Sequence, residues 1–156
     1  LVGAESRAAA LASSLEGGLN DIRARAAALP RRPRVFFEEW DDPLISGIRW
    51  VDELVEIAGG QCLFPELRAG RLARERIVPA ERVAALDPEV IIASWCGKGV
   101  KKRTIVERPG WDRVSAVRHG HVYEIRSTYI LQPGPAALTE GVKRVHECIA
   151  RAAGQA

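Results

Sequence analysis

Cys96 directly follows a strongly apolar segment of the chain. The segment "EVIIAS" (89–94) predicts a buried strand, and after it come Trp95, Cys96 and the loop "GKGVKKR". A thiolate at a strand end, followed by glycines and basic residues, is the arrangement in which some enzymes attack phosphate or sulfur groups. The spacing fits that chemistry poorly, because Lys102 rather than an arginine stands six residues after Cys96. A small α/β enzyme with Cys96 as its nucleophile stays open as an alternative.

Two other predicted strands also end beside a large aromatic residue. Trp40, Asp41 and Asp42 follow the strand predicted at 34–39, and Ser127, Thr128 and Tyr129 follow the strand predicted at 121–126. In open parallel sheets, ligands bind beyond the carboxyl ends of the strands. Three aromatic strand ends, with Trp95 as the third, therefore predict a broad, flat surface for a large ligand.

Metal binding and carboxylate catalysis find little support in the sequence. The histidines are His119, His121 and His146, two at a predicted turn and one in the last predicted helix. No pair of cysteines has the C-x-x-C spacing of a zinc site. Glu38 and Glu39 are neighbours in a strand and point to opposite faces, so they cannot act as a pair. We expect no bound metal and no cofactor.

The elements that position these groups alternate between strands and helices. Apolar residues spaced by three and four predict one long helix up to Leu29, which Pro30 ends. A short strand is predicted at 62–64, and "WDDPLISG" (40–47) is predicted to be a loop. Further helices are predicted at 50–58, 79–87, 101–107, 112–118 and 135–152. This order predicts an α/β fold, a three-layer sandwich with a mainly parallel sheet of about four strands, preceded by a long helix.

The composition is typical of one globular domain. The chain has 156 residues, of which 47% are hydrophobic and 28% charged, and this is enough to bury a core. No apolar run reaches the ~18 residues that a membrane helix needs. The net charge is +3, but the basic residues are scattered, which argues against a nucleic-acid partner. Without a methionine or a secretory-type N-terminal segment, the chain is expected to be a piece of a longer protein.

The three cysteines leave the disulfide state open. Cys62 and Cys148 both lie near helices that should pack together, so a bridge between them is one hypothesis. A count of one free thiol rather than three would support it.

Several motifs in series resemble one known family. The segments "VFFEEWDDPLISG", "RWVDELVEIAGG", "VPAERVAALDPEVIIASWCG", "PGWDRVSAVRHGHVYEI" and "QPGPAALTEGV" resemble, in order and spacing, the carboxyl-terminal half of periplasmic substrate-binding proteins of ABC importers. The class is the one that binds cobalamin, iron-siderophores and haem, and "EEW-DP" and "WCG" look most like its cobalamin-binding branch. The resemblance runs from about Arg34 to the end, and the leading helix looks like the one that joins the two lobes in that class.

The resemblance implies a non-catalytic protein with two α/β lobes and a ligand between them. Residues 1–30 would be the connecting helix, residues 31–156 the C-terminal lobe, and an N-terminal lobe would supply the other cleft wall. Positions that face the cleft in this class correspond to Trp40, Asp41, Asp42, Trp95, Cys96 and Tyr129, whose rings would pack on a corrin or similar macrocycle. Thr128 and Gln132 stand where some cobalamin binders carry charged contact residues, so polar contacts to the ligand would differ.

One surface residue carries a partner hypothesis. Glu81, in "PAERV", matches the glutamate with which these lobes dock onto the membrane permease. Without the resemblance it would be an ordinary solvated carboxylate near a helix N-terminus.

Together these features predict the ligand-binding lobe of a periplasmic, or otherwise extracytoplasmic and membrane-associated, receptor. It would capture cobalamin or a related corrinoid and deliver it to the permease subunits of an ABC importer. An iron-siderophore or haem binding protein of the same class is the second hypothesis. The isolated chain should bind its ligand weakly, because half of the cleft is missing and the aromatic rings face water. Such an exposed apolar surface also favours self-association of the fragment.

Overall fold

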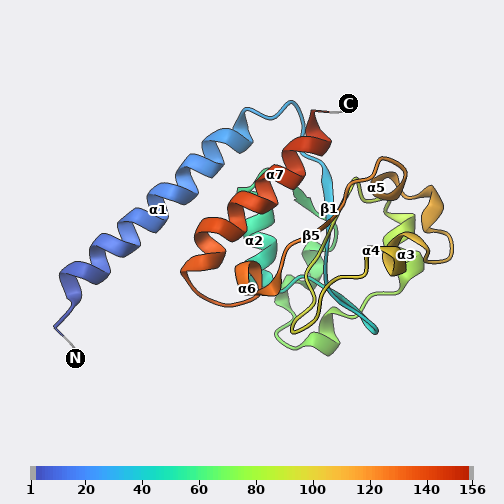
Figure 1. The fold of residues 1–156 in the computed structure, drawn as a ribbon, viewed down its shortest axis with the longest axis horizontal. Helices are drawn as coiled ribbons and strands as arrows, with labels where there is room; N and C mark the ends of the chain where they lie inside the picture. The colour runs from blue at the N-terminus through green and yellow to red at the C-terminus, as the bar shows by residue number, and fades with distance from the viewer. Residues whose placement is uncertain (1–2, 155–156) are drawn as a thin grey trace.

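A computed structural model describes residues 3–154 and places a mainly parallel sheet between two layers of helices (Figure 1). The strands are β1 (Arg34–Asp41), β2 (Leu44–Ser46), β3 (Gln61–Cys62), β4 (Val90–Ala93) and β5 (Val122–Glu124). Their order is β2-β1-β4-β5, with β3 also paired to β1. The β1–β4, β4–β5 and β1–β3 pairs are parallel, and β1–β2 is antiparallel. The predicted α/β sandwich is confirmed, with five strands in place of about four.

Side chains that alternate along the central strands build a core on each face of the sheet. Phe37 and Ile92 belong to one buried cluster, whereas Phe36 and Ile91 belong to the other. Successive residues of a strand point to opposite faces, so strands covered on both sides must be apolar throughout. This is why the continuous apolar runs of β1 and β4 predicted the sheet correctly.

The helices divide between these two cores. On one face lie α1 (Glu5–Ala27), α2 (Arg49–Ile57) and α7 (Val142–Ala153), which a π-helical turn at Ala137–Gly141 precedes. On the other face lie α3 (Ala80–Ala85), α4 (Lys102–Val106), the 3₁₀ turn Trp111–Arg113 and α5 (Ser115–Arg118). Two further 3₁₀ turns, Pro65–Ala69 and Ala73–Arg76, connect β3 to α3. The short helix α6 (Ser127–Ile130) follows β5.

One local prediction was wrong, and one strand is shorter than predicted. The segment "WDDPLISG" is not a loop throughout, because Leu44–Ser46 forms β2 and pairs with β1 as a hairpin. Leu44, Ile45 and Ser46 are all buried, so they need the backbone partners that β1 supplies. The strand predicted at 121–126 is shorter, because β5 spans Val122–Glu124, and the residues predicted to follow it begin the single helical turn α6.

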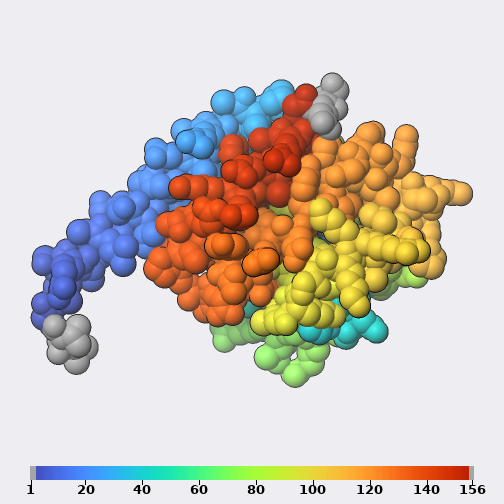
Figure 2. All heavy atoms as spheres, in the orientation of Figure 1, coloured from blue at the N-terminus to red at the C-terminus, as the bar shows by residue number. Residues whose placement is uncertain are grey.

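The long helix α1 lies against the body along only part of its length. Ile22 is its buried residue, whereas Leu11 is 52% exposed. Figure 2 shows the first half of α1 reaching beyond the body of the molecule. The predicted apolar stripe exists, but its N-terminal part covers nothing among the described residues 3–154.

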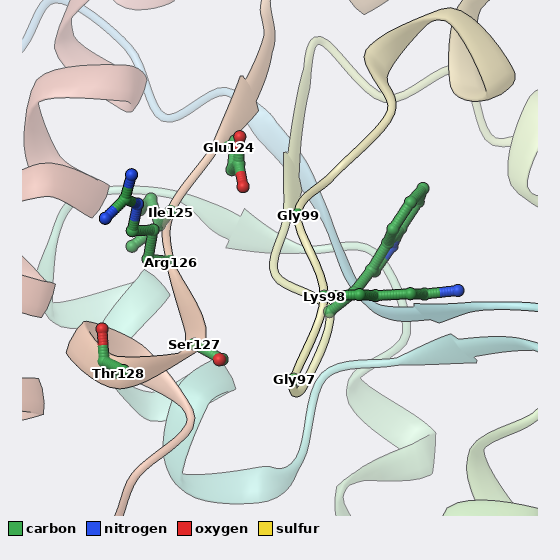
Figure 3. A pocket seen from close by; sticks show the side chains of 9 residues that line it. Gly97, Lys98, Gly99, Glu124, Ile125, Arg126, Ser127 and Thr128 are labelled. Carbon is green, nitrogen blue, oxygen red and sulfur yellow. The ribbon is translucent and has the colours of Figure 1, made fainter.

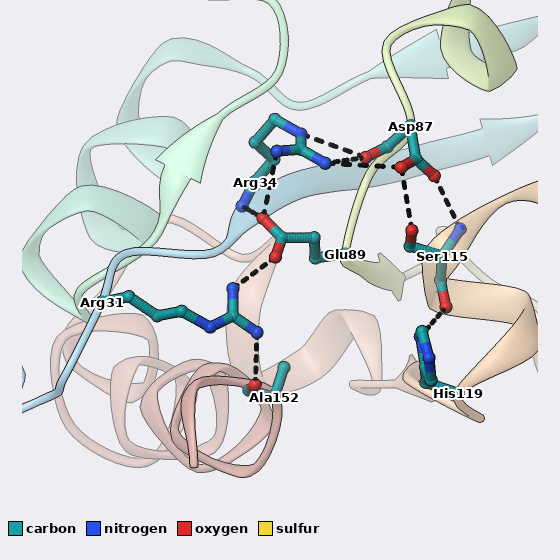
Figure 4. A network of polar contacts seen from close by, with 7 residues as sticks. All are labelled: Arg31, Arg34, Asp87, Glu89, Ser115, His119 and Ala152. Atoms are coloured by element: carbon teal, nitrogen blue, oxygen red, sulfur yellow. Dashed lines mark hydrogen bonds and ion pairs between the residues drawn. The ribbon is translucent and has the colours of Figure 1, made fainter. Parts of the chain in front are cut away.

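A polar network holds the segment between α1 and β1 in place (Figure 4). Arg31 pairs with Glu89 and donates a hydrogen bond to the carbonyl oxygen of Ala152 at 2.7 Å. The backbone N–H of Arg34 donates to Glu89 Oε2 at 2.9 Å, and its guanidinium donates to the carbonyl oxygen of Asp87 at 2.7 Å. These contacts hold three segments together at the N-terminal ends of the strands. They are the residues between α1 and β1, the end of α7 and the segment before β4.

Candidate functional site

The carboxyl ends of three parallel strands meet at one edge of the sheet. Glu38, Ala93 and Glu124 are in register across β1, β4 and β5. The residues that follow them therefore emerge side by side, and these include Trp40, Trp95 and Arg126. This is the edge at which the sequence predicted a ligand surface.

Two adjoining hollows open at this edge. The first has a volume of about 530 Å³ and lies between the loop Gly97–Gly99 and residues 124–128, with Trp95 also in its lining (Figure 3). The second has a volume of about 330 Å³ and is lined by Glu124, Arg126, Tyr129 and Arg144. Glu124 and Arg126 belong to both linings, so the two hollows form one concave surface beyond β4 and β5.

A buried ion pair holds one wall of this surface. Glu38 is fully buried and receives two hydrogen bonds from Arg108, at 2.6 and 2.8 Å. The indole Nε1 of Trp95 donates a third hydrogen bond to Glu38, at 3.1 Å. Burial raises the pKa of Glu38 above its ordinary value, and the contacts from Arg108 and Trp95 oppose that rise. Glu38 thus fixes the orientation of the Trp95 ring.

The prediction that the aromatic rings face water is wrong for Trp95. Its side chain is 2% exposed and belongs to the core cluster on the α3–α5 face. Trp40 is partly buried, and its Nε1 donates to the carbonyl oxygen of Asp42 at 2.9 Å. A large ligand would therefore meet less free aromatic surface at this edge than three exposed rings would provide.

Trp40, Asp41 and Trp95 gather around a lysine that the sequence did not single out. The Nζ of Lys98 lies 2.6 Å from Asp41 Oδ1. The same atom lies 4.1 Å from the ring centroid of Trp40 and 4.8 Å from that of Trp95. Lys98 therefore bridges the β1–β2 hairpin and the loop after β4.

The other predicted site residues are more dispersed. Tyr129 lines the second hollow, with the guanidinium carbon of Arg144 4.6 Å from its ring centroid. Cys96 and Asp42 are exposed and adjoin, in the chain, the residues that surround Lys98. Gln132 is exposed beyond α6 and lines neither hollow. Glu81 is exposed in the first turn of α3, and it too lines neither hollow.

Sequence reasoning missed the cations of this surface. Arg126 lies two residues after β5 and was the last residue of the strand predicted at 121–126, so its place at a strand end was a signal that could have found it. Lys98 was noticed only as part of a basic loop. Arg144 comes from α7, far along the chain, and no pattern in the sequence connects it with the strand ends.

The residues that the structure describes contain neither a candidate metal site nor a candidate membrane helix. Within 3–154, histidine, cysteine, aspartate and glutamate side chains form no group of three that could hold a metal ion. None of the helices in that same range combines the length and the apolar character needed to cross a membrane.

All three cysteines are free, which contradicts the hypothesis of a bridge between Cys62 and Cys148. Cys62 is buried, Cys148 is partly buried and Cys96 is exposed. Burial raises the pKa of Cys62 to about 12 and that of Cys148 to about 12. A thiolate is the reactive form, so both of these thiols should react slowly in the folded chain.

We therefore predict that only the exposed thiol, that of Cys96, reacts rapidly with a disulfide reagent at neutral pH in the native protein. All three thiols should react after unfolding. The Cys96→Ser variant should lose the rapid phase and keep two slow thiols. A single titratable thiol after unfolding without reductant would contradict the free state of Cys62 and Cys148.

The comparisons with known proteins agree on one family. A sequence model of the family described as "Periplasmic binding protein" matches residues 1–129. YvrC of Bacillus subtilis, an uncharacterized ABC transporter substrate-binding lipoprotein, is 27% identical over 156 residues, which cover 94% of this chain and 46% of YvrC.

Solved structures show the same fold. The periplasmic haem-binding protein RhuT of Roseiflexus sp. RS-1 is similar with a TM-score of 0.78 and 21% identity, over 97% of this chain and 59% of RhuT. The periplasmic vitamin B12 binding protein BtuF of Vibrio cholerae gives a TM-score of 0.67 and 21% identity, over 90% of this chain and 52% of BtuF. The chain thus spans about half the length of the proteins that it matches.

Proposed function

The chain belongs to the periplasmic binding protein family, and we propose that it is one ligand-binding lobe of a receptor that serves an ABC importer. The observation that carries the proposal is the concave surface beyond β4 and β5, where the two hollows share Glu124 and Arg126. Ligands of open parallel sheets bind at this edge. A hollow open on one side is what half of a two-walled cleft would present.

Residues 1–30 act as the connecting helix and residues 31–156 as the C-terminal lobe. The support is the position of α1, whose first half extends beyond the body and leaves Leu11 exposed (Figure 1). An N-terminal lobe of the same protein would pack against this part of α1 and close the cleft from the other side. The apolar positions of α1 that cover nothing here would then be buried.

The first choice of ligand is cobalamin or a related corrinoid. Tyr129 lines the second hollow, and Trp40 lies against Lys98, which lines the first; both rings can pack against a flat macrocycle by burying apolar area. The structural likeness to BtuF, a vitamin B12 binding protein, is in keeping with this choice.

A second choice, haem or an iron-siderophore, is favoured by the cations of the second hollow. Arg126 and Arg144 both line it, and guanidinium groups bind carboxylates and related anions through charge-assisted hydrogen bonds. Haem carries two carboxylates, and siderophores bind iron through anionic oxygens. RhuT, a haem-binding protein, shares the fold.

The lobe works by binding and not by catalysis. Its family is made up of transporter substrate-binding proteins, and Cys96 is an exposed thiol on the loop beside the first hollow. We assign Cys96 no nucleophilic role. It contributes a small side chain at the cleft rim, together with Asp42 and, beyond α6, Gln132.

Glu81 is the proposed docking residue for the permease subunits. It is exposed at the start of α3, and Ile77, which is 45% exposed, lies shortly before it. The protein would act in the periplasm or another extracytoplasmic compartment, attached to the membrane in the manner of the related lipoprotein. Without the other lobe, the open cleft would also favour self-association of this chain.

Ligand titration of the two-lobe receptor tests the proposal. Cyanocobalamin is expected to quench tryptophan fluorescence at or below ~10 μM, the range in which binding is worth about 7 kcal/mol. The Arg126→Ala variant should bind hemin roughly tenfold more weakly if the ligand is anionic, and cyanocobalamin unchanged. Lys101→Ala, which removes an exposed charge outside both linings, is the matched control. The absence of quenching by cyanocobalamin at tens of micromolar would reject the corrinoid.

A further inference from the structure

The Lys98 ammonium occupies the ring faces at the hairpin end of the site. Its Nζ lies 4.1 Å from the centroid of Trp40 and 4.8 Å from that of Trp95, within the range of a cation–π contact to both rings. Asp41 Oδ1, at 2.6 Å, neutralises the charge. Two rings and a carboxylate therefore form a box for a cation, and a residue of the chain itself fills that box.

We propose that Lys98 is an internal latch that controls access of the ligand to Trp40 and Trp95. A flat ring can stack on these indoles only after the ammonium has left them. This inference rests on the proposed function for its ligand, but the latch itself is a property of the unliganded chain. It makes Lys98 a residue that sets which ligands the aromatic edge admits.

The latch is built so that it can open. Lys98 is 42% exposed in its side chain, and Figure 3 shows that side chain extending away from Arg126, on the opposite side of the loop Gly97–Gly99. Gly97 has a φ of +78°, and a side-chain carbon added at Gly97 or Gly99 would meet nothing within 4 Å. Apart from Lys98, the loop is tied to the sheet by the backbone N–H of Val100, which donates to Glu124 at 3.1 Å.

Opening the latch exchanges one set of contacts for another. The ammonium gives up two ring contacts and an exposed ion pair, and water can solvate it instead. The ligand gains the ring faces that the ammonium leaves. The apparent association constant equals the intrinsic one multiplied by the fraction of molecules whose ring faces are free. Removing the ammonium is therefore expected to tighten the binding of a flat ligand by about 2- to 30-fold, the range that one cation–π contact spans.

Nuclear magnetic resonance of the 156-residue chain tests the latch without a ligand. The methylene protons next to Nζ of Lys98 should be shifted upfield by the two indole rings, unlike those of Lys101. In Lys98→Ala, the indole N–H signals of Trp40 and Trp95 should move, while those of Trp50 and Trp111 stay in place and report an intact fold. Lys98→Arg should keep the wild-type pattern, because a guanidinium also stacks on an indole. Ordinary chemical shifts for the Lys98 methylenes would overturn the latch.

Ligand titration of the two-lobe receptor tests the consequence. Lys98→Ala should bind cyanocobalamin or hemin about 2- to 30-fold more tightly than wild type, and Lys98→Arg and Lys101→Ala should bind it as wild type does. Equal or weaker binding by Lys98→Ala would overturn the control of access. If neither probe binds to any of these proteins, the proposed function fails for both ligands, and the chemical shifts of Lys98 alone decide the latch.

Discussion

Replacing Arg108 with methionine is expected to lower the free energy of unfolding by about 3–5 kcal/mol at pH 8. Arg108 makes two hydrogen bonds to Glu38, which has no exposed surface. Without Arg108, the carboxylate keeps its desolvation cost and loses its opposite charge. Methionine retains the packing against Trp111, whose ring centroid lies 4.5 Å from the guanidinium carbon of Arg108. Urea unfolding followed by circular dichroism measures the change.

Two matched variants separate the unpaired charge from other causes. Arg103→Met removes an arginine whose ion pair with Glu107 is 83% and 58% exposed, and it should cost less than about 1 kcal/mol. Adding Glu38→Gln to Arg108→Met removes the unpaired carboxylate and should restore most of the lost stability. If the double variant stays as unstable as Arg108→Met, the loss has its origin in packing and not in charge.

Replacing Asp52 with asparagine is expected to stabilise the protein at high pH and to change little at low pH. Asp52 is buried in α2, and burial raises its pKa from 3.8 to about 7. Arg68 and Arg76 oppose that rise without cancelling it, since Arg68 Nε is 3.9 Å from the carboxylate and Arg68 Nη2 is paired with Glu56. The folded protein therefore binds the Asp52 proton more tightly than the unfolded chain does.

The direction of the pH effect follows from that difference. The contribution of Asp52 to stability is fully present below pH 3.8 and is lost as the pH rises through about 7. A pKa difference of about 3 units corresponds to about 4 kcal/mol. The stability difference between Asp52→Asn and wild type should thus grow from near zero at pH 4 to about 4 kcal/mol in favour of the variant at pH 8.

Urea unfolding at pH 4, 6 and 8 measures this difference directly. Glu53→Gln, an exposed neighbour on α2 that pairs with Arg49, is the control and should leave the pH profile of wild type unchanged. A pH dependence that remains in Asp52→Asn would reveal the part contributed by Glu38, whose pKa is raised in the same direction. If Asp52→Asn and wild type differ equally at pH 4 and pH 8, the raised pKa of Asp52 is wrong.

The elements of the fold that the sequence predicted well are those whose structure depends on the pattern of their own residues. The apolar runs of β1 and β4 can be satisfied only by burial on both faces, and so they predicted a covered parallel sheet. The stripe of α7 and the proline and glycine signals around α2 and α3 likewise act over a few neighbouring residues. β2 escaped prediction because three residues carry too little pattern, and β1 alone gives them partners.

The same division holds for the candidate site. The sequence predicted that Trp40, Trp95 and Tyr129 follow strand ends at one edge of the sheet. In the structure Trp40 lies near the end of β1, Trp95 comes shortly after β4, and Tyr129 lies in α6, which follows β5. How those rings are used depends on residues distant in the chain. Arg108 lies 70 residues from Glu38 and fixes Trp95 through it, and Lys98 lies 57 residues from Asp41. Arg144 reaches Tyr129 from another helix.

By itself, then, the sequence determined the fold class and predicted the candidate site at the edge near Trp40, Trp95 and Tyr129, since backbone periodicity and chain order are local properties. Only the tertiary structure decided that Trp95 is buried against an ion pair, that Lys98 lies on two rings and that Arg126 and Arg144 share a hollow. Burial and pairing of charges depend on which distant segments pack together, and no pattern within one segment contains that information.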